Sequence, residues 1–124
     1  MMDHASRVDV ALADLLKHEG LTGASLISRD GLCVRAAGRS EVSRETFSAM
    51  SATLMGAAEI ALRELDNAPA RSIVAATPNA CIVIVGASRE MLLVASARTD
   101  VPLAPLVARV EEAARGLAKI LSGA

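Results

Sequence analysis

The chain has 124 residues, with 13 basic and 14 acidic side chains and a formal net charge of −1. This length suits one domain spanning residues 1–124, and 52% hydrophobic residues are typical of a globular protein. The charge balance leaves no basic stripe for nucleic acid, and Phe47, the single aromatic residue, gives no platform for stacking bases. No apolar run reaches the ~18 residues of a membrane span, and the first residues lack a signal-peptide core. We therefore expect a cytoplasmic protein that neither binds nucleic acid nor inserts into a membrane.

The first third of the chain predicts a helix and then a β-hairpin. Apolar residues recur at helical spacing from Asp3 to His18, with Asp3 or Ser6 as the cap and Gly20 as the end. Two strand-like runs, 23–29 and 32–37, then flank Asp30-Gly31. Two such runs around Asp-Gly are the strongest short hairpin signal that a sequence offers.

The rest of the chain predicts a long helix, three strands and a last helix. Ser43 is the expected cap of the long helix, which runs to about Asp66, and Val42 and Phe47 are spaced as a hydrophobic staple. Short loops separate strand-like runs at 71–77, 80–86 and 91–97, and the last helix begins near 101–103 and ends at Leu121.

The predicted order is α-β-β-α-β-β-β-α, and the tight connections between strands imply an antiparallel sheet. The runs at 80–85 and 91–95 are apolar without alternation, which is typical of strands covered on both faces. The predicted fold class is therefore α/β of the α+β kind: a five-stranded antiparallel sheet with helices on both faces.

The long helix has two apolar sides. At 100° per residue, one side collects larger residues, and we expect it to face the sheet. The opposite side is also apolar, and no charged residue occurs between Glu45 and Glu59. A helix that is apolar all round is a buried helix, and a chain this small has no second layer to cover it, so we expect a homodimer; an exposed, alanine-rich helix is the alternative. The predicted sheet side is Phe47, Met50, Leu54, Ala57, Ala58, Ala61 and Leu65, and the predicted dimer side is Ala49, Ala52, Thr53, Gly56 and Ile60.

Motifs for catalysis and for cofactors are absent from the sequence. There is no G-x-x-x-x-G-K-[ST], no G-x-G-x-x-G and no G-x-S-x-G, and no acid, base and nucleophile form a set. Cys33 and Cys81 have no metal-type spacing and are expected to be reduced and apart. We expect neither an enzyme nor a protein with a metal ion or a cofactor.

The segment Gly23-Ala-Ser-Leu-Ile-Ser-Arg-Asp-Gly-Leu-Cys-Val resembles the first hairpin of roadblock / dynein light chain domains. Met91-Leu-Leu-Val-Ala followed by the last helix resembles their ending, and the element order matches over nearly the whole chain. One departure is the stretch Val101-Pro-Leu-Ala-Pro105, where family members often have a small, glycine-containing segment.

This resemblance implies a profilin-like roadblock fold, with the first and last helices on one face of the sheet and the long helix on the other. It implies homodimers in which the long helices pair and the third strands meet edge to edge, which adds Ile73 and Ala75 to the expected interface. It also implies work with Ras-like GTPases as activators, scaffolds or recruiters, or with motor complexes.

Three functions remain open at the level of sequence. The first is a homodimeric protein-binding module that regulates or scaffolds a small Ras-like GTPase. The second is a structural adaptor for a non-GTPase partner, and the third is a profilin-like sensor of a small ligand. Five arginines at loops or element ends are candidates to contact acidic partner surfaces, although each also fits a plain surface charge: Arg39, Arg44, Arg71, Arg89 and Arg98.

Overall fold

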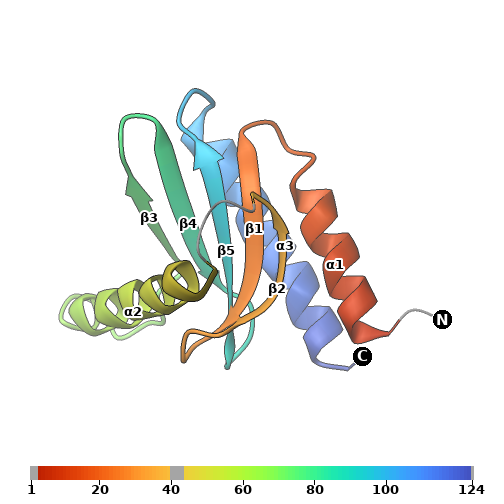
Figure 1. Ribbon diagram of the computed structural model, residues 1–124. Coiled ribbons are helices and arrows are strands. Elements are labelled where there is room, and N and C mark those ends of the chain that lie inside the picture. Colours follow the sequence, from red (N-terminus) through yellow and green to blue (C-terminus); the bar gives the residue numbers. More distant parts are fainter. Residues whose placement is uncertain (1–2, 40–43, 124) are drawn as a thin grey trace.

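The computed structural model describes residues 3–39 and 44–123 (Figure 1). The helices are α1 (His4–Leu15), α2 (Arg44–Arg63) and α3 (Leu103–Leu121). The strands are β1 (Leu21–Ser28), β2 (Cys33–Gly38), β3 (Ser72–Ala76), β4 (Ala80–Gly86) and β5 (Met91–Arg98). The predicted order of elements is confirmed.

The five strands form one antiparallel sheet in the order β2-β1-β5-β4-β3. Helices α1 and α3 cover one face and α2 crosses the other, as Figure 1 shows. The central strands β5 and β4 are apolar without alternation because both of their faces are covered. The predicted fold class is therefore confirmed.

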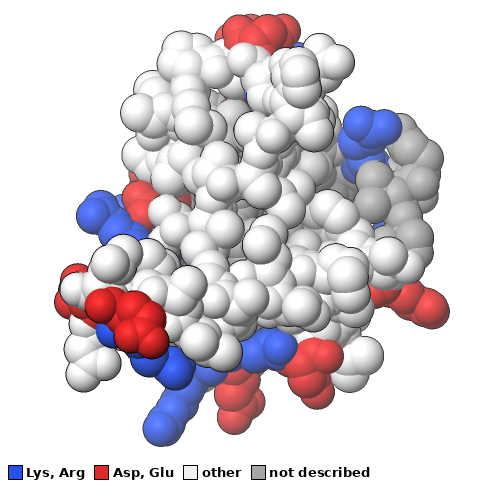
Figure 2. Space-filling model, turned by 90° about the vertical axis from the view of Figure 1, so that its left-hand side faces the viewer, with Lys and Arg blue, Asp and Glu red and all other residues white. Residues whose placement is uncertain are grey.

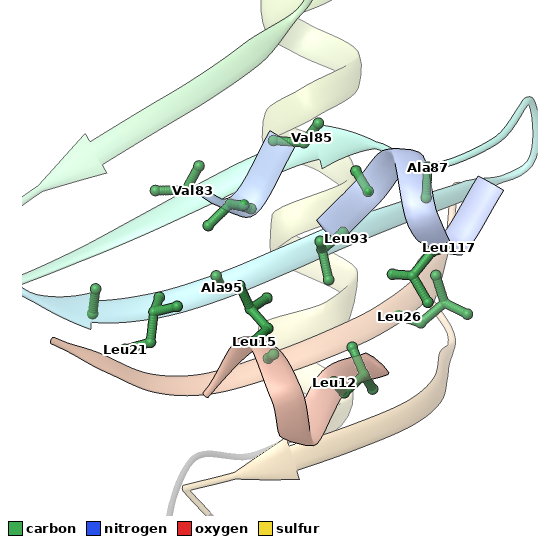
Figure 3. Close-up of a cluster of buried hydrophobic side chains, with 14 of the residues drawn as sticks. Leu12, Leu15, Leu21, Leu26, Val83, Val85, Ala87, Leu93, Ala95 and Leu117 are labelled. Carbon is green, nitrogen blue, oxygen red and sulfur yellow. The ribbon is translucent and has the colours of Figure 1, made fainter. Parts of the chain in front are cut away.

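The larger core lies between the sheet and the pair α1 and α3. Leu12 and Leu15 of α1 and Leu117 of α3 point onto Leu26 and Leu93 of the sheet (Figure 3). All five side chains are at most 1% exposed. Burying a leucine contributes about 1.5–3 kcal/mol, so this layer supplies much of the stability of the single chain.

The predicted hairpin forms at Asp30-Gly31, and it also positions α2. Gly31 has a φ of +97°, a conformation that side chains disfavour, and an ideal Cβ there would lie 3.0 Å from the Cα of Ala49. The Leu32 amide donates to the Ser28 hydroxyl over 3.0 Å, which closes the turn. The turn therefore packs directly on the backbone of α2.

The helix ends agree in part with the predictions. Asp3 caps α1 as expected, because its carboxylate accepts a 2.8 Å hydrogen bond from the Ser6 amide. Helix α1 ends at Leu15 and not near His18, and the turn that follows leads into Gly20, whose φ is +95°. The expected cap at Ser43 and the Val42 half of the staple lie outside the described residues.

Candidate protein-binding surface

The structure corrects the predicted orientation of α2. The side that faces the sheet carries Ser48, Ser51, Ala52 and Met55, each at most 8% exposed. Met55 and Ala52 pack with Ile27 and Ile84 of the sheet. Of the predicted sheet side, Phe47 and Leu54 pack at the border of this core, whereas Met50, Ala57, Ala61 and Leu65 are exposed. Small serine and alanine side chains let the helix lie close against the strands and the Gly31 turn.

The exposed side of α2 is apolar, as the sequence suggested, and its residues agree in part with those expected. Thr53 and Ile60 of the predicted outward side are exposed, Ile60 at 65%. Met50 is 58% exposed, Ala57 and Ala61 are also exposed, and Leu65, in the turn that follows α2, is 85% exposed. Phe47, Leu54 and Ala58 are half-buried on the flank of the helix. A large apolar face of this kind on a small domain marks an interaction surface.

The edge strand β3 adjoins this face of α2. It pairs with β4 from Ser72–Val85 to Ala76–Cys81, and its other edge borders no strand of the sheet. Its residues carry neither charge nor proline, and Val74 is 39% exposed. Together, the exposed side of α2 and the edge of β3 form what we call the α2–β3 surface.

Charged residues lie at the margin of this surface. Figure 2 looks at the side of the molecule that β3 and the end of α2 occupy, and its centre is broad and uncharged. At the margin, Arg29 pairs with Glu59 over 3.0 Å and Arg71 pairs with Glu111 over 3.1 Å. An uncharged centre with a charged rim is the usual anatomy of a protein interface.

A groove of about 460 Å³ opens on the same face of the sheet, beside α2. Ala75, Ala80 and Ile82 contribute to its apolar lining, and Arg39 and Arg98 also line it. A 3.0 Å hydrogen bond joins the hydroxyls of Thr22 and Ser96, which also line the groove. The sequence does not predict this groove, because its lining residues come from four strands, from the loops beside them and from Phe47 of α2, and become neighbours only in the folded chain.

The residues predicted for the dimer interface fall into three groups by exposure. Thr53, Ile60 and Ala75 are exposed, and Ala49, Gly56 and Ile73 are half-buried. Ala52 is 8% exposed and belongs to the chain's own core, so its place in the predicted interface is a correction. The Thr53 hydroxyl donates to the Ala49 carbonyl over 2.8 Å, which satisfies it within the helix.

The candidate arginines are dispersed rather than gathered into one cluster. Arg71 pairs with Glu111, and Arg98 pairs with Asp100 over 3.0 Å. Arg39 and Arg44 both line a small pocket at the start of α2. Arg89 is exposed in the turn between β4 and β5.

Both cysteines are free thiols on strands that are not neighbours, as predicted. Cys81 is buried, and burial raises the pKa of its thiol, whereas Cys33 is half-buried because β2 is an edge strand. Among residues 3–39 and 44–123, the structure has no group of three or more His, Cys, Asp or Glu side chains that could hold a metal ion. Within the same residues, no helix is long and apolar enough to cross a membrane.

The fold and the α2–β3 surface define a class of protein: a small sheet domain between two helical layers that presents an apolar face. The family model of the Roadblock/LC7 domain matches residues 7–97. The chain belongs to this family.

Solved structures support the same fold. An MglB structure described as having a tetrameric arrangement is 20% identical, with a TM-score of 0.91 over 99% of this chain and 93% of the other. A Roadblock/LC7 domain from Streptomyces avermitilis is also 20% identical, with a TM-score of 0.84 over 92% and 97%. Profilin IA of Acanthamoeba castellanii, 17% identical, has a TM-score of 0.64 over 93% and 96%. Among curated proteins, none matches this sequence.

Proposed function

We propose that this protein is a homodimeric protein-binding module, without catalytic activity of its own, that regulates or scaffolds a small Ras-like GTPase. The observation that carries the proposal is the α2–β3 surface, which exposes Met50, Ile60 and Leu65 around an uncharged strand edge. Membership of the roadblock family supports the GTPase as the class of partner.

The edge of β3 is the part of the surface best suited to a second copy. Natural sheets protect their edges with charges, prolines or bulges, and β3 has neither charge nor proline in its five residues. The opposite edge strand, β2, is protected in two ways. It carries a charge, Arg35, which pairs with Asp9 of α1, and its pairing with β1 shifts register after Leu26. Antiparallel pairing of β3 with the β3 of a second chain obeys a two-fold axis and joins the two sheets.

Sedimentation tests the dimer. The wild-type chain is expected to be a dimer at micromolar concentration, and Ala57→Glu is expected to be a folded monomer because it places a carboxylate in the centre of the exposed α2 face. Ala108→Glu is the matched control, since Ala108 is an exposed alanine of α3. A wild-type monomer at these concentrations contradicts the proposal.

The proposed regulatory action requires a preference for one nucleotide state. A module that binds both states of a GTPase equally cannot shift their equilibrium, so any regulation must come from differential affinity for the two. Calorimetric titration of the dimer with a Ras-like GTPase of the same cell, loaded with GDP or with a GTP analogue, measures that difference. Titration with free GTP and GDP is the control, and no tight binding is expected.

The outcomes of this titration separate the alternatives. A preference for one loaded form supports regulation. Equal affinity for both forms leaves scaffolding or the structural adaptor, and tight binding of free nucleotide overturns the module. The small-ligand sensor requires the groove to bind a solute.

A further inference from the structure

One end of the groove beside α2 is polar, and we call this end, formed by Thr22, Ser96 and Arg98, the notch. The hydroxyls of Thr22 and Ser96 lie 3.0 Å apart there. Thr22 belongs to β1, whereas Ser96 and Arg98 belong to β5, so β4 separates the notch from the edge strand β3. The notch therefore lies apart from the strand edge on which the proposed dimer depends.

The backbone of the strands fixes the two hydroxyls of the notch. The pairing of β1 with β5 shifts register between Leu21 and Gly23, which leaves Thr22 as the extra residue of a bulge. Bulges redirect side chains, and this one sets the Thr22 hydroxyl against that of Ser96. An ideal Cβ on Gly23 would lie 2.8 Å from the Ser96 hydroxyl oxygen, so a side chain there would displace that hydroxyl. The absence of a side chain at Gly23 thus keeps the notch open.

Arginine side chains make the notch positively charged. Arg98 is 48% exposed, and it pairs with Asp100 through Nε over 3.0 Å. Among the described residues, no other group bonds the guanidinium of Arg98, so its two terminal nitrogens are available to an acceptor. Arg39 also lines the groove, and none of the described lining residues is acidic. An arginine side chain binds a carboxylate through two parallel hydrogen bonds, so the notch suits one carboxylate.

Beyond the notch, the lining of the groove is apolar. Ala75, Ala80 and Ile82 of the sheet contribute to it, together with Phe47 of α2. The volume of about 460 Å³ lies in the range of sites that hold small organic molecules, which are typically apolar with a few convergent polar groups. A ligand that matches this lining has an aliphatic chain attached to one anionic group.

We propose that the groove binds a medium-chain aliphatic carboxylate. Its carboxylate lies in the notch, where it accepts hydrogen bonds from the terminal nitrogens of Arg98. One of the two hydroxyls donates to the other, so the second has its hydrogen available for the carboxylate. The aliphatic chain lies along Ala80 and Ile82. This inference goes beyond the proposed regulation of a GTPase, and it requires neither that partner nor a second chain.

Titration followed by two-dimensional amide NMR spectra locates the ligand. Octanoate is expected to shift the amide resonances of Thr22, Ser96 and Arg98 in the wild-type chain. Butanoate has the same charge and a shorter chain, and it should bind about ten-fold more weakly or worse, since each methylene that becomes buried contributes a factor of roughly two to four. Octanol has the chain without the charge, and it should also bind about ten-fold more weakly, because it forms no charge-assisted hydrogen bond.

Arg98→Gln separates the charge from the shape of the groove. It is expected to weaken octanoate about ten-fold and to leave octanol unchanged, a difference that a merely structural role of Arg98 would not produce. Arg89→Gln is the matched control, because Arg89 is exposed in the turn between β4 and β5 and does not line the groove. Ala80→Phe fills the apolar part with an aromatic ring and is expected to weaken both ligands.

Three results would each overturn the site. They are the absence of any shift with millimolar octanoate, equal affinities of octanoate and octanol for the wild type, and shifts confined to the exposed side of α2 at Met50 and Ile60. None of these results bears on the dimer or on the GTPase, which sedimentation and the GTPase titration measure separately. Shifts at the notch, together with a loss of octanoate affinity that is specific to Arg98→Gln, establish the site.

Discussion

Gly31 is the residue on which the hairpin and α2 both depend. Its φ of +97° and the 3.0 Å approach of its ideal Cβ to the Ala49 Cα both disfavour a side chain. We expect Gly31→Ala to lower the free energy of unfolding by ~1–3 kcal/mol, because it adds backbone strain and pushes the turn away from α2. Urea unfolding measures the loss.

Gly116 supplies the comparison for Gly31. It lies within α3, and an ideal Cβ there meets no atom within 4 Å. Gly116→Ala is therefore expected to stabilise the chain by ~0.5–1 kcal/mol, because alanine favours a helix interior. If Gly31→Ala and Gly116→Ala change the free energy of unfolding equally, the Gly31 turn places no special constraint on its side chain.

The pair of Asp9 and Arg35 makes stability depend on pH. Hydrogen bonds from the Arg35 guanidinium, including one of 2.9 Å from Nε, lower the pKa of the Asp9 carboxyl below its ordinary value. A lowered pKa in the folded state means that the pair stabilises the fold above the unfolded pKa of about 3.9, and that this contribution is lost as pH falls through the folded value. We expect Asp9→Asn to lower the urea midpoint at neutral pH and to have no effect at the acidic end of the range.

A double-mutant cycle with Arg35→Gln isolates this pair. The coupling between the two substitutions should fade below about pH 4. A coupling that stays constant into stronger acid would contradict the assigned cause, since a protonated Asp9 no longer carries the charge that the guanidinium binds.

At the scale of elements, the sequence predicted the strands well and the orientation of α2 poorly. Asp30-Gly31 located the first hairpin, and the predicted 80–86 strand coincides with Ala80–Gly86, because turn residues and apolar runs mark strand ends locally. Predicting the orientation of a helix from its sequence depends on a contrast in polarity between its two sides. In α2 that contrast is weak, since Ser48 and Ser51 face the sheet while Met50 and Ile60 face outward.

The corrected orientation predicts opposite consequences for two alanines of α2. Ala52→Glu inserts a carboxylate between the helix and the sheet, beside Met55 and Ile84, and should destabilise the single chain by about 3–5 kcal/mol. Ala57→Glu should leave the chain folded, because Ala57 is exposed. Urea unfolding followed by far-ultraviolet circular dichroism compares the free energies of unfolding of the two variants. Equal stability of Ala52→Glu and Ala57→Glu would support the orientation predicted from the sequence.

At the scale of the whole molecule, the proposed dimer links stability to protein concentration. Unfolding of a dimer releases two chains, so the midpoint of thermal unfolding is expected to rise with concentration. Scans over a hundred-fold range of concentration measure the shift. A constant midpoint for the wild type, equal to that of Ala57→Glu, would mean that the second copy contributes nothing to stability.

The groove could not be predicted from the sequence. Thr22 and Ser96 lie on strands that the chain forms far apart, and they come together only because β5 inserts between β1 and β4. Local patterns carry no information on the order of strands in a sheet, whereas the apolar character of α2 is local and is visible in the sequence.

The uncharged edge of β3 also bears on how the protein is made. In the absence of the proposed second chain, Ser72–Ala76 is an edge strand without charge or proline, and such a strand can pair with another extended segment that it encounters. Newly synthesised monomers are therefore at risk of aggregation in proportion to the time they spend alone. In the proposed dimer, rapid pairing of identical chains removes that edge from the surface, so assembly would also protect solubility.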